Sequence, residues 1–150
     1  MALDPGGLDI LLVEDNPNDA ELTLHACRNL TARIHLVRDG AEAIDFLFGT
    51  GAYAGRGMTE KPKVILLDVK LPKIDGLEVL RLIKLDPRTS SIPVVLLTSS
   101  PEERDIVAGY SLGANSYIVK PVEFAGFTKT VHDLGLYWLS MNKSPIDRVA

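Results

Sequence analysis

The chain has 150 residues, enough for one domain with its own hydrophobic core and too few for two domains of standard size. Its net charge of -4, without a cluster of Lys and Arg, argues against binding to nucleic acid. The sequence shows no signal peptide and no apolar run near the ~20 residues of a membrane span, and its single cysteine, Cys27, fits a reducing compartment. We therefore expect a cytoplasmic protein that binds neither nucleic acid nor membrane.

In chain order, short apolar runs alternate with helix-like stretches, and the pair occurs five times. The first apolar run precedes a helix that Asn16 caps and Pro17 opens. We expect strands over 10–13, 34–37, 64–67, 94–97 and 116–119, and helices over 17–30, 41–48, 76–85, 102–112 and 124–138. The Gly-rich stretch 49–62 is unusually long for a connection between a helix and a strand.

The runs at 10–13, 64–67 and 94–97 do not alternate with polar residues. Such runs are typical of central strands in a parallel sheet that helices cover on both faces. The weaker runs at 34–37 and 116–119 suit the edges of that sheet. The repeated order predicts a doubly wound α/β fold with right-handed crossovers. We expect one domain over 8–139, with an N-terminal extension (1–7) and a C-terminal tail (140–150).

Charged and hydroxyl side chains follow four of these strands. Glu14 and Asp15 come after the first strand and Asp68 after the third, while Thr98 and Lys120 follow the fourth and fifth. Ligands of open parallel sheets bind at the carboxyl ends of the strands, so these side chains should meet at one edge. Each close pair of carboxylates there repels by about 4 kcal/mol at an effective dielectric constant of 20. The cluster therefore needs a cation or a lysine to neutralise it.

Carboxylate oxygens without Cys or His favour Mg2+ over zinc. The three histidines, His25, His35 and His132, lack metal-ligand spacing and are interpreted as surface or packing residues. A lysine and a hydroxyl beside Mg2+ are features of phosphoryl-transfer sites, and a carboxylate can carry a covalent phosphoryl group. The residues alone therefore predict a Mg2+-dependent aspartyl-phosphate site.

Four motifs of this chain together resemble those of the response-regulator receiver domain, which has the fold of the chemotaxis regulators. The resemblance covers about residues 8 to 138 and implies a flavodoxin-like, five-stranded parallel sheet with the strand order 2-1-3-4-5. The motifs are Leu12-Val13-Glu14-Asp15, Leu67-Asp68-Val69-Lys70-Leu71-Pro72-Lys73-Ile74-Asp75-Gly76, Leu97-Thr98-Ser99 and Tyr117-Ile118-Val119-Lys120-Pro121.

The resemblance implies that Asp68 is the acceptor of a phosphoryl group from the phosphohistidine of a histidine kinase. It also implies that Asp15, Asp68 and the backbone carbonyl of Lys70 bind Mg2+, and that Glu14 holds the ion through water. The Lys70 side chain adds a cation near the site, and the sequence does not give the direction of its effect on the lifetime of the phosphoryl group.

Four further roles follow from the same resemblance. Lys120 pairs with the acceptor carboxylate and then with the phosphoryl oxygens. Thr98 turns inward to the phosphoryl group, and Tyr117 follows it as the aromatic switch residue. Pro121 corresponds to a cis-proline that directs the lysine into the site. The surface formed by the last two helices and strands then changes shape in response to a local charge.

Two segments, 45–55 and 135–139, resemble single-domain receivers that are paired with phytochrome-type histidine kinases. Receivers of that branch often dimerise through the output face, so the resemblance implies a homodimer. Two other functions stay open. The first is a receiver-like scaffold that is never phosphorylated. The second is an aspartate-nucleophile phosphatase of the haloacid-dehalogenase type, against which Lys70 argues because that family has a second Asp at this position.

Overall fold

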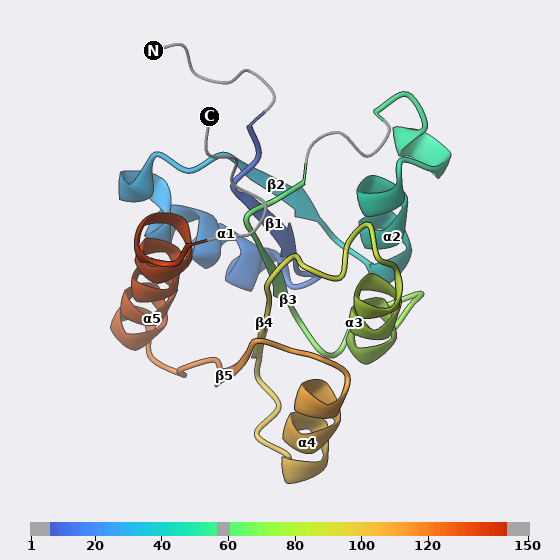
Figure 1. Ribbon diagram of the computed structural model, residues 1–150. Helices are drawn as coiled ribbons and strands as arrows, with labels where there is room; N and C mark the ends of the chain where they lie inside the picture. Colours follow the sequence, from blue (N-terminus) through green and yellow to red (C-terminus); the bar gives the residue numbers. More distant parts are fainter. Residues whose placement is uncertain (1–6, 57–60, 144–150) are drawn as a thin grey trace.

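The computed structural model describes residues 7–56 and 61–143, so residues 1–6 of the predicted extension and 144–150 of the predicted tail lie outside it. The strands are β1 (Ile10–Val13), β2 (Ile34–Val37), β3 (Val64–Leu67), β4 (Val94–Thr98) and β5 (Ser116–Val119). The helices are α1 (Pro17–Ala26), α2 (Gly40–Phe48), α3 (Gly76–Leu85), α4 (Glu103–Ser111) and α5 (Phe124–Leu136). All strand pairs are parallel in the order β2-β1-β3-β4-β5, which confirms the predicted fold (Figure 1).

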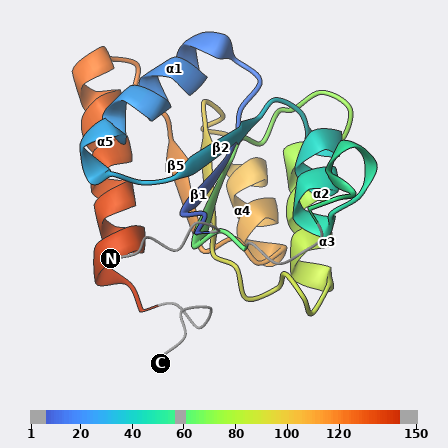
Figure 2. The same cartoon turned by 90° about the horizontal axis from the view of Figure 1, so that it is seen from above.

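The sheet lies between two layers of helices. Figure 2 shows α1 and α5 on one side of the sheet and α2, α3 and α4 on the other. Side chains of a strand alternate between the faces, so Ile10 and Leu12 pack toward α1 and α5 while Leu11 and Val13 pack toward α2 and α3. All four are buried, and each such side chain contributes about 1.5–3 kcal/mol when fully removed from water. The absence of polar alternation in β1 thus reflects burial on both faces.

The helix ends differ from the predicted ones on the side of α1 and α5. The first helix stops at Ala26 and continues as a 3-10 turn, Arg28–Leu30, that brings Leu30 against Gly135 of α5. A Cβ at Gly135 would lie 2.4 Å from Leu30, so the absence of a side chain there permits the contact. The α-helical part of α5 ends at Leu136, and a π-helical turn extends it to Met141, past the predicted helix end at 138. Among the described helices none is long and apolar enough to cross a membrane.

The long connection after α2 is anchored to the sheet edge by an aromatic cluster. Its 3-10 turn, Gly51–Tyr53, places the Tyr53 hydroxyl 3.0 Å from Nε2 of His35 on β2, and this hydroxyl donates to Glu42 of α2 at 2.8 Å. The His35 ring stacks on Phe46 with 4.3 Å between centroids, and Tyr53 meets both rings edge-on. The sequence marked this segment only as a Gly-rich connection, and its residues 57–60 lie outside the described parts.

This packing predicts a pH dependence of stability. Burial lowers the pKa of His35, the Arg56 charge lowers it further, and Glu42 opposes them. The unfolded chain therefore binds a proton at higher pH than the folded one, and the free energy of unfolding falls as pH drops below about 6.5. We expect this decrease to be smaller in H35Q, by less than about 1 kcal/mol because water reaches part of the ring. Urea denaturation between pH 7.5 and 5 measures the free energy of unfolding of the wild type and of H35Q. An equal decrease of this free energy in both proteins would contradict the prediction.

Candidate functional site

The carboxyl ends of four strands bring the predicted site residues to one edge of the sheet. Glu14 follows β1, Asp68 follows β3, Thr98 ends β4 and Lys120 follows β5. The ladders continue past the strands: the Asp68 N–H donates to the Val13 carbonyl at 3.2 Å, and the Lys120 N–H donates to the Thr98 carbonyl at 2.7 Å. The backbone register therefore places these side chains together.

The Lys120 ammonium lies at the centre of the site and contacts three carboxylates. Its Nζ is 2.6 Å from Glu14, 2.8 Å from Asp19 and 3.0 Å from Asp68. The lysine, Glu14 and Asp68 are buried, whereas the Asp19 side chain is 27% exposed. Asp19 was missed by the sequence analysis. The only signal for it was an acid in the first turn of the helix that begins at this edge, and a favourable interaction with the helix dipole explains such an acid equally well.

Three acids form a group that fits a divalent cation. Glu14, Asp15 and Asp68 each offer one carboxylate oxygen, and the three atoms lie within 4.8 Å of one another. Mg2+ ligands lie about 2.0–2.1 Å from the ion, so ligands on opposite sides are about 4.2 Å apart. The donor set is hard oxygen only, which suits Mg2+. The Lys70 carbonyl stays a predicted ligand, while the Lys70 side chain points to Asp105, at 3.8 Å.

Burial and charge act against each other at this edge. Burial raises the pKa of Glu14 to about 7, although the Lys120 hydrogen bond and charge lower it and the Asp68 charge adds to the rise. Burial would lower the pKa of Lys120, but the hydrogen bonds that it donates to Asp19 and Glu14 and the charge of Asp68 outweigh it. The net result is a raised pKa, so Lys120 stays charged at neutral pH. The site thus combines a permanent ammonium with carboxylates in an environment that water only partly screens.

The predicted switch residues meet at Ser100, in the loop after β4. The Ser100 N–H donates to Oγ1 of the fully buried Thr98 at 3.4 Å, and the Tyr117 hydroxyl donates to the Ser100 carbonyl at 2.8 Å. The Ser100 hydroxyl donates to the buried Asp105 of α4 at 2.6 Å. Thr98 and Tyr117 are therefore connected through the loop that joins β4 to α4. The inward movement of both side chains stays a prediction.

Pro121 does not follow a cis peptide bond, because the described part of the chain contains none. The prediction of a cis-proline is therefore wrong. The trans form of a bond before proline is favoured by about 0.5–1 kcal/mol. With the bond before Pro121 in the trans form, the Lys120 side chain reaches Glu14 and Asp68.

The loop after Asp68 packs tightly on the start of α2. The Gly40 N–H donates to the Pro72 carbonyl at 3.2 Å, and Lys73 lies 3.4 Å from Asp39. A Cβ at Gly40 would lie 1.9 Å from the carbonyl oxygen of Ile74. The absence of a side chain at Gly40 therefore sets how closely the loop after Asp68 approaches α2.

This contact predicts that G40A is destabilising although alanine favours helices. The added methyl group must push the Ile74 backbone away, and overpacking of this kind costs about 1–3 kcal/mol. The matched control is G55A, because a Cβ at Gly55 meets no atom within 4 Å. Urea denaturation should show a lower midpoint for G40A and a wild-type midpoint for G55A. Equal midpoints for the two variants would show that the loop tolerates the displacement.

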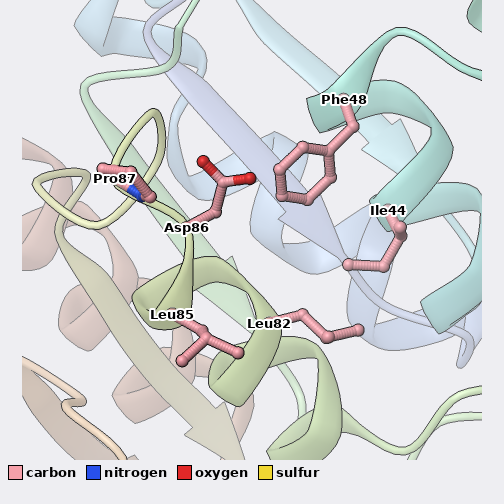
Figure 3. Close-up of a pocket in the computed structure, with 6 residues that line it drawn as sticks. All are labelled: Ile44, Phe48, Leu82, Leu85, Asp86 and Pro87. Carbon is pink, nitrogen blue, oxygen red and sulfur yellow. The ribbon is translucent and has the colours of Figure 1, made fainter.

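A separate apolar cleft of about 370 Å³ lies between α2 and α3, away from the acidic edge (Figure 3). Side chains from both helices line it, together with Asp86 and Pro87 after α3. The Asp86 carboxylate accepts hydrogen bonds from Arg88 at 2.7–3.3 Å, so its charge is already paired. The cleft therefore offers apolar surface without a reactive group, and the acidic edge remains the candidate site.

A parallel sheet of this strand order, with acids and a lysine at its carboxyl edge, defines the receiver class of two-component signalling domains. The chain belongs to this family: the model of the response regulator receiver domain matches residues 10–132. It is therefore a signalling domain of the response-regulator kind.

Several known proteins that match most of the chain are similar to it in sequence or structure. The probable methanogenesis regulatory protein FilR2 of Methanothrix harundinacea is 44% identical over 91% of this chain and 86% of its own length. The response regulator Rcp1 of Synechocystis sp. is 40% identical over 87% of this chain and 88% of its own, and its Mn(2+)-bound crystal structure has a TM-score of 0.85 over 92% and 99%. The phosphorylated cyanobacterial phytochrome response regulator RcpA is 41% identical, with a TM-score of 0.86 over 93% of this chain and 99% of that one.

Proposed function

We propose that this response regulator accepts a phosphoryl group on Asp68 from a histidine kinase and that Mg2+ assists the transfer. The observation that carries the proposal is the Lys120 ammonium, which lies 3.0 Å from the Asp68 carboxylate beside the other acids of the edge. The similarity to RcpA, described as phosphorylated, and to Rcp1, described as Mn(2+)-bound, supports the same assignment.

In the proposed step, a carboxylate oxygen of Asp68 forms a bond to phosphorus as the P–N bond of the phosphohistidine breaks. The leaving imidazole keeps the bonding pair and takes up a proton from solvent. Lys120 neutralises charge on the phosphoryl oxygens, and Thr98 donates its hydroxyl to one of them. The bottom of the site is buried, so these charges act more strongly there than in water.

In this proposal Mg2+ would be bound directly by Asp15, Asp68 and the Lys70 carbonyl. Glu14 would hold the ion through a water molecule. Bound there, the ion supplies positive charge next to the transferred phosphoryl group. Asp15 is exposed whereas Glu14 and Asp68 are buried, so the ion would enter from the solvent side.

Phosphorylation would then alter the surface of α4, β5 and α5. The added group brings about -1.5 to -2 charges and three acceptor oxygens close to Thr98. Exposed apolar side chains lie on this surface and are available to a partner: Val107, Tyr110, Val119, Val122 and Phe124. We propose that a second copy of the chain binds there to form a homodimer. The downstream target would bind the same surface.

The kinase partner is proposed to be of the phytochrome type, because RcpA is described as a phytochrome response regulator and AtBRR as a bacteriophytochrome response regulator. AtBRR is 51% identical, with a TM-score of 0.70. A histidine kinase delivers its phosphoryl group in the cytoplasm, so we place the protein there. No nucleic-acid or membrane partner is part of this proposal.

Incubation with acetyl phosphate tests the acceptor. We expect one phosphoryl adduct on the wild type by intact-mass spectrometry when Mg2+ is present, and none on D68N, because the amide cannot act as the nucleophile. The matched control is D75N: Asp75 lies in the same loop and caps α3, and Asn caps a helix equally well, so its adduct should equal that of the wild type.

Two results would contradict the acceptor assignment. An adduct on D68N at the wild-type rate would place the phosphoryl group on another residue. No adduct on a folded wild type would favour the unphosphorylated scaffold. Release of inorganic phosphate from small phosphomonoesters would favour the phosphatase, against which the Lys70 side chain argues.

Mg2+ should also stabilise the folded protein. An ion that binds only the folded state raises the free energy of unfolding, by about 2.7 kcal/mol at 100 times its dissociation constant. We expect D15N to lose most of this increase, because the substitution removes one ligand charge. E103Q, which removes an exposed acid of α4, should keep it. Urea denaturation with and without Mg2+ measures the difference, and equal increases for D15N and E103Q would exclude Asp15 as a ligand.

A further inference from the structure

Asp19 is a member of the site that lies outside the motifs of the family resemblance. It belongs to the first turn of α1, and its Oδ2 lies 2.8 Å from the Lys120 ammonium. It is also outside the group of three acids that can share one cation. Within the described residues, the lysine is the side chain that binds this carboxylate.

The backbone of α1 is held so that this carboxylate faces the lysine. The Asn16 side chain accepts hydrogen bonds from the N–H groups of Asn18 and Asp19, at 2.9 and 3.1 Å. The Asn16 N–H in turn donates to Oε2 of Glu14 at 3.1 Å. Glu14 therefore binds Lys120 with one oxygen and fixes the start of α1 with the other, which couples the position of Asp19 to the same site.

The number of donors on the ammonium gives Asp19 a distinct task. A lysine ammonium has three N–H donors, and three carboxylates surround Lys120 at hydrogen-bonding distance. Two of these, on Glu14 and Asp68, also belong to the group that fits a cation. When Asp68 binds an ion or a phosphoryl group, Asp19 and Glu14 still hold the lysine in place, and of these two only Asp19 lies outside the group that fits a cation.

We propose that Asp19 is a positioning residue for phosphoryl transfer, which rests on the proposed function of Asp68. Its carboxylate accepts a hydrogen bond from one N–H of Lys120. This bond holds the ammonium at the site while Asp68 loses its contact with the lysine and forms its bond to phosphorus. The lysine then keeps one donor aimed at the acceptor, and the other two stay on Asp19 and Glu14. Without Asp19 the ammonium can turn toward Glu14 or water.

The test compares D19N with E21Q. Both substitutions remove one negative charge from α1 and keep the shape of the side chain, but Glu21 is exposed and no contact joins it to Lys120. We expect the rate of phosphorylation by acetyl phosphate to fall about tenfold in D19N, the effect of about 1.4 kcal/mol, and further in D19A. E21Q should react at the wild-type rate. This result would show that the slower reaction of D19N does not come from the loss of a charge at long range.

A second readout follows the lysine directly. The ammonium protons of Lys120 should exchange with water more than fivefold faster in D19N than in the wild type, as measured by 15N NMR of the labelled side chain, and E21Q should leave exchange unchanged. D19E, which keeps the charge, should recover part of both effects. A role of Asp19 only as a charge in the first turn of α1, favourable to the helix dipole, would leave the exchange of these protons unaltered.

The outcomes separate this proposal from the one on which it rests. An adduct on the wild type with equal rates for D19N and E21Q overturns the role of Asp19 alone. Faster proton exchange in D19N without a slower reaction also overturns it, because the contact would then be structural. No adduct on the wild type overturns the acceptor assignment and the positioning role together.

Discussion

The site depends on one buried ammonium that joins four elements of the fold. Lys120 follows β5, and the carboxylates around it follow β1 and β3 or lie in the first turn of α1. The ends of β1, β3 and β5 are far apart in the sequence, and the register of the parallel sheet brings them to one point. The acids would repel each other there without the lysine. The charge of Lys120 is therefore the condition under which this arrangement of carboxylates can exist.

The acidic edge contributes little to the stability of the fold. Removing carboxylates from water costs several kcal/mol per ion, and nearby charges seldom return all of it. The raised pKa of Glu14 shows this imbalance, because burial outweighs even the contact with Lys120. Stability comes instead from the two apolar layers on either side of the sheet. A costly group of charges that the core does not need is typical of a site retained for binding or chemistry.

The sequence predicted the sheet well because burial on both faces leaves a direct pattern. Runs such as Val64–Leu67 lack polar positions, and their weaker counterparts lie at the two edges. Features that depend on partners distant in the sequence were not predictable. Tyr53 binds His35 across the edge of the sheet, and the 3-10 turn after α1 depends on the space beside Gly135. The cis form of Pro121 was predicted from the family resemblance alone, and the described part of the chain contains no cis peptide bond.

One connection from the site to the outer surface passes through Ser100. Ser100 accepts the Tyr117 hydroxyl on its carbonyl, donates its own hydroxyl to Asp105, and donates its N–H to Thr98. A turn of the buried Thr98 hydroxyl toward Asp68 would break its hydrogen bond from the Ser100 N–H and would allow the loop that carries Ser100 to shift. Such a shift breaks or moves the bond that holds the Tyr117 ring and the one that holds α4. Because both contacts share a single residue, a displacement of Ser100 would alter α4 and β5 together.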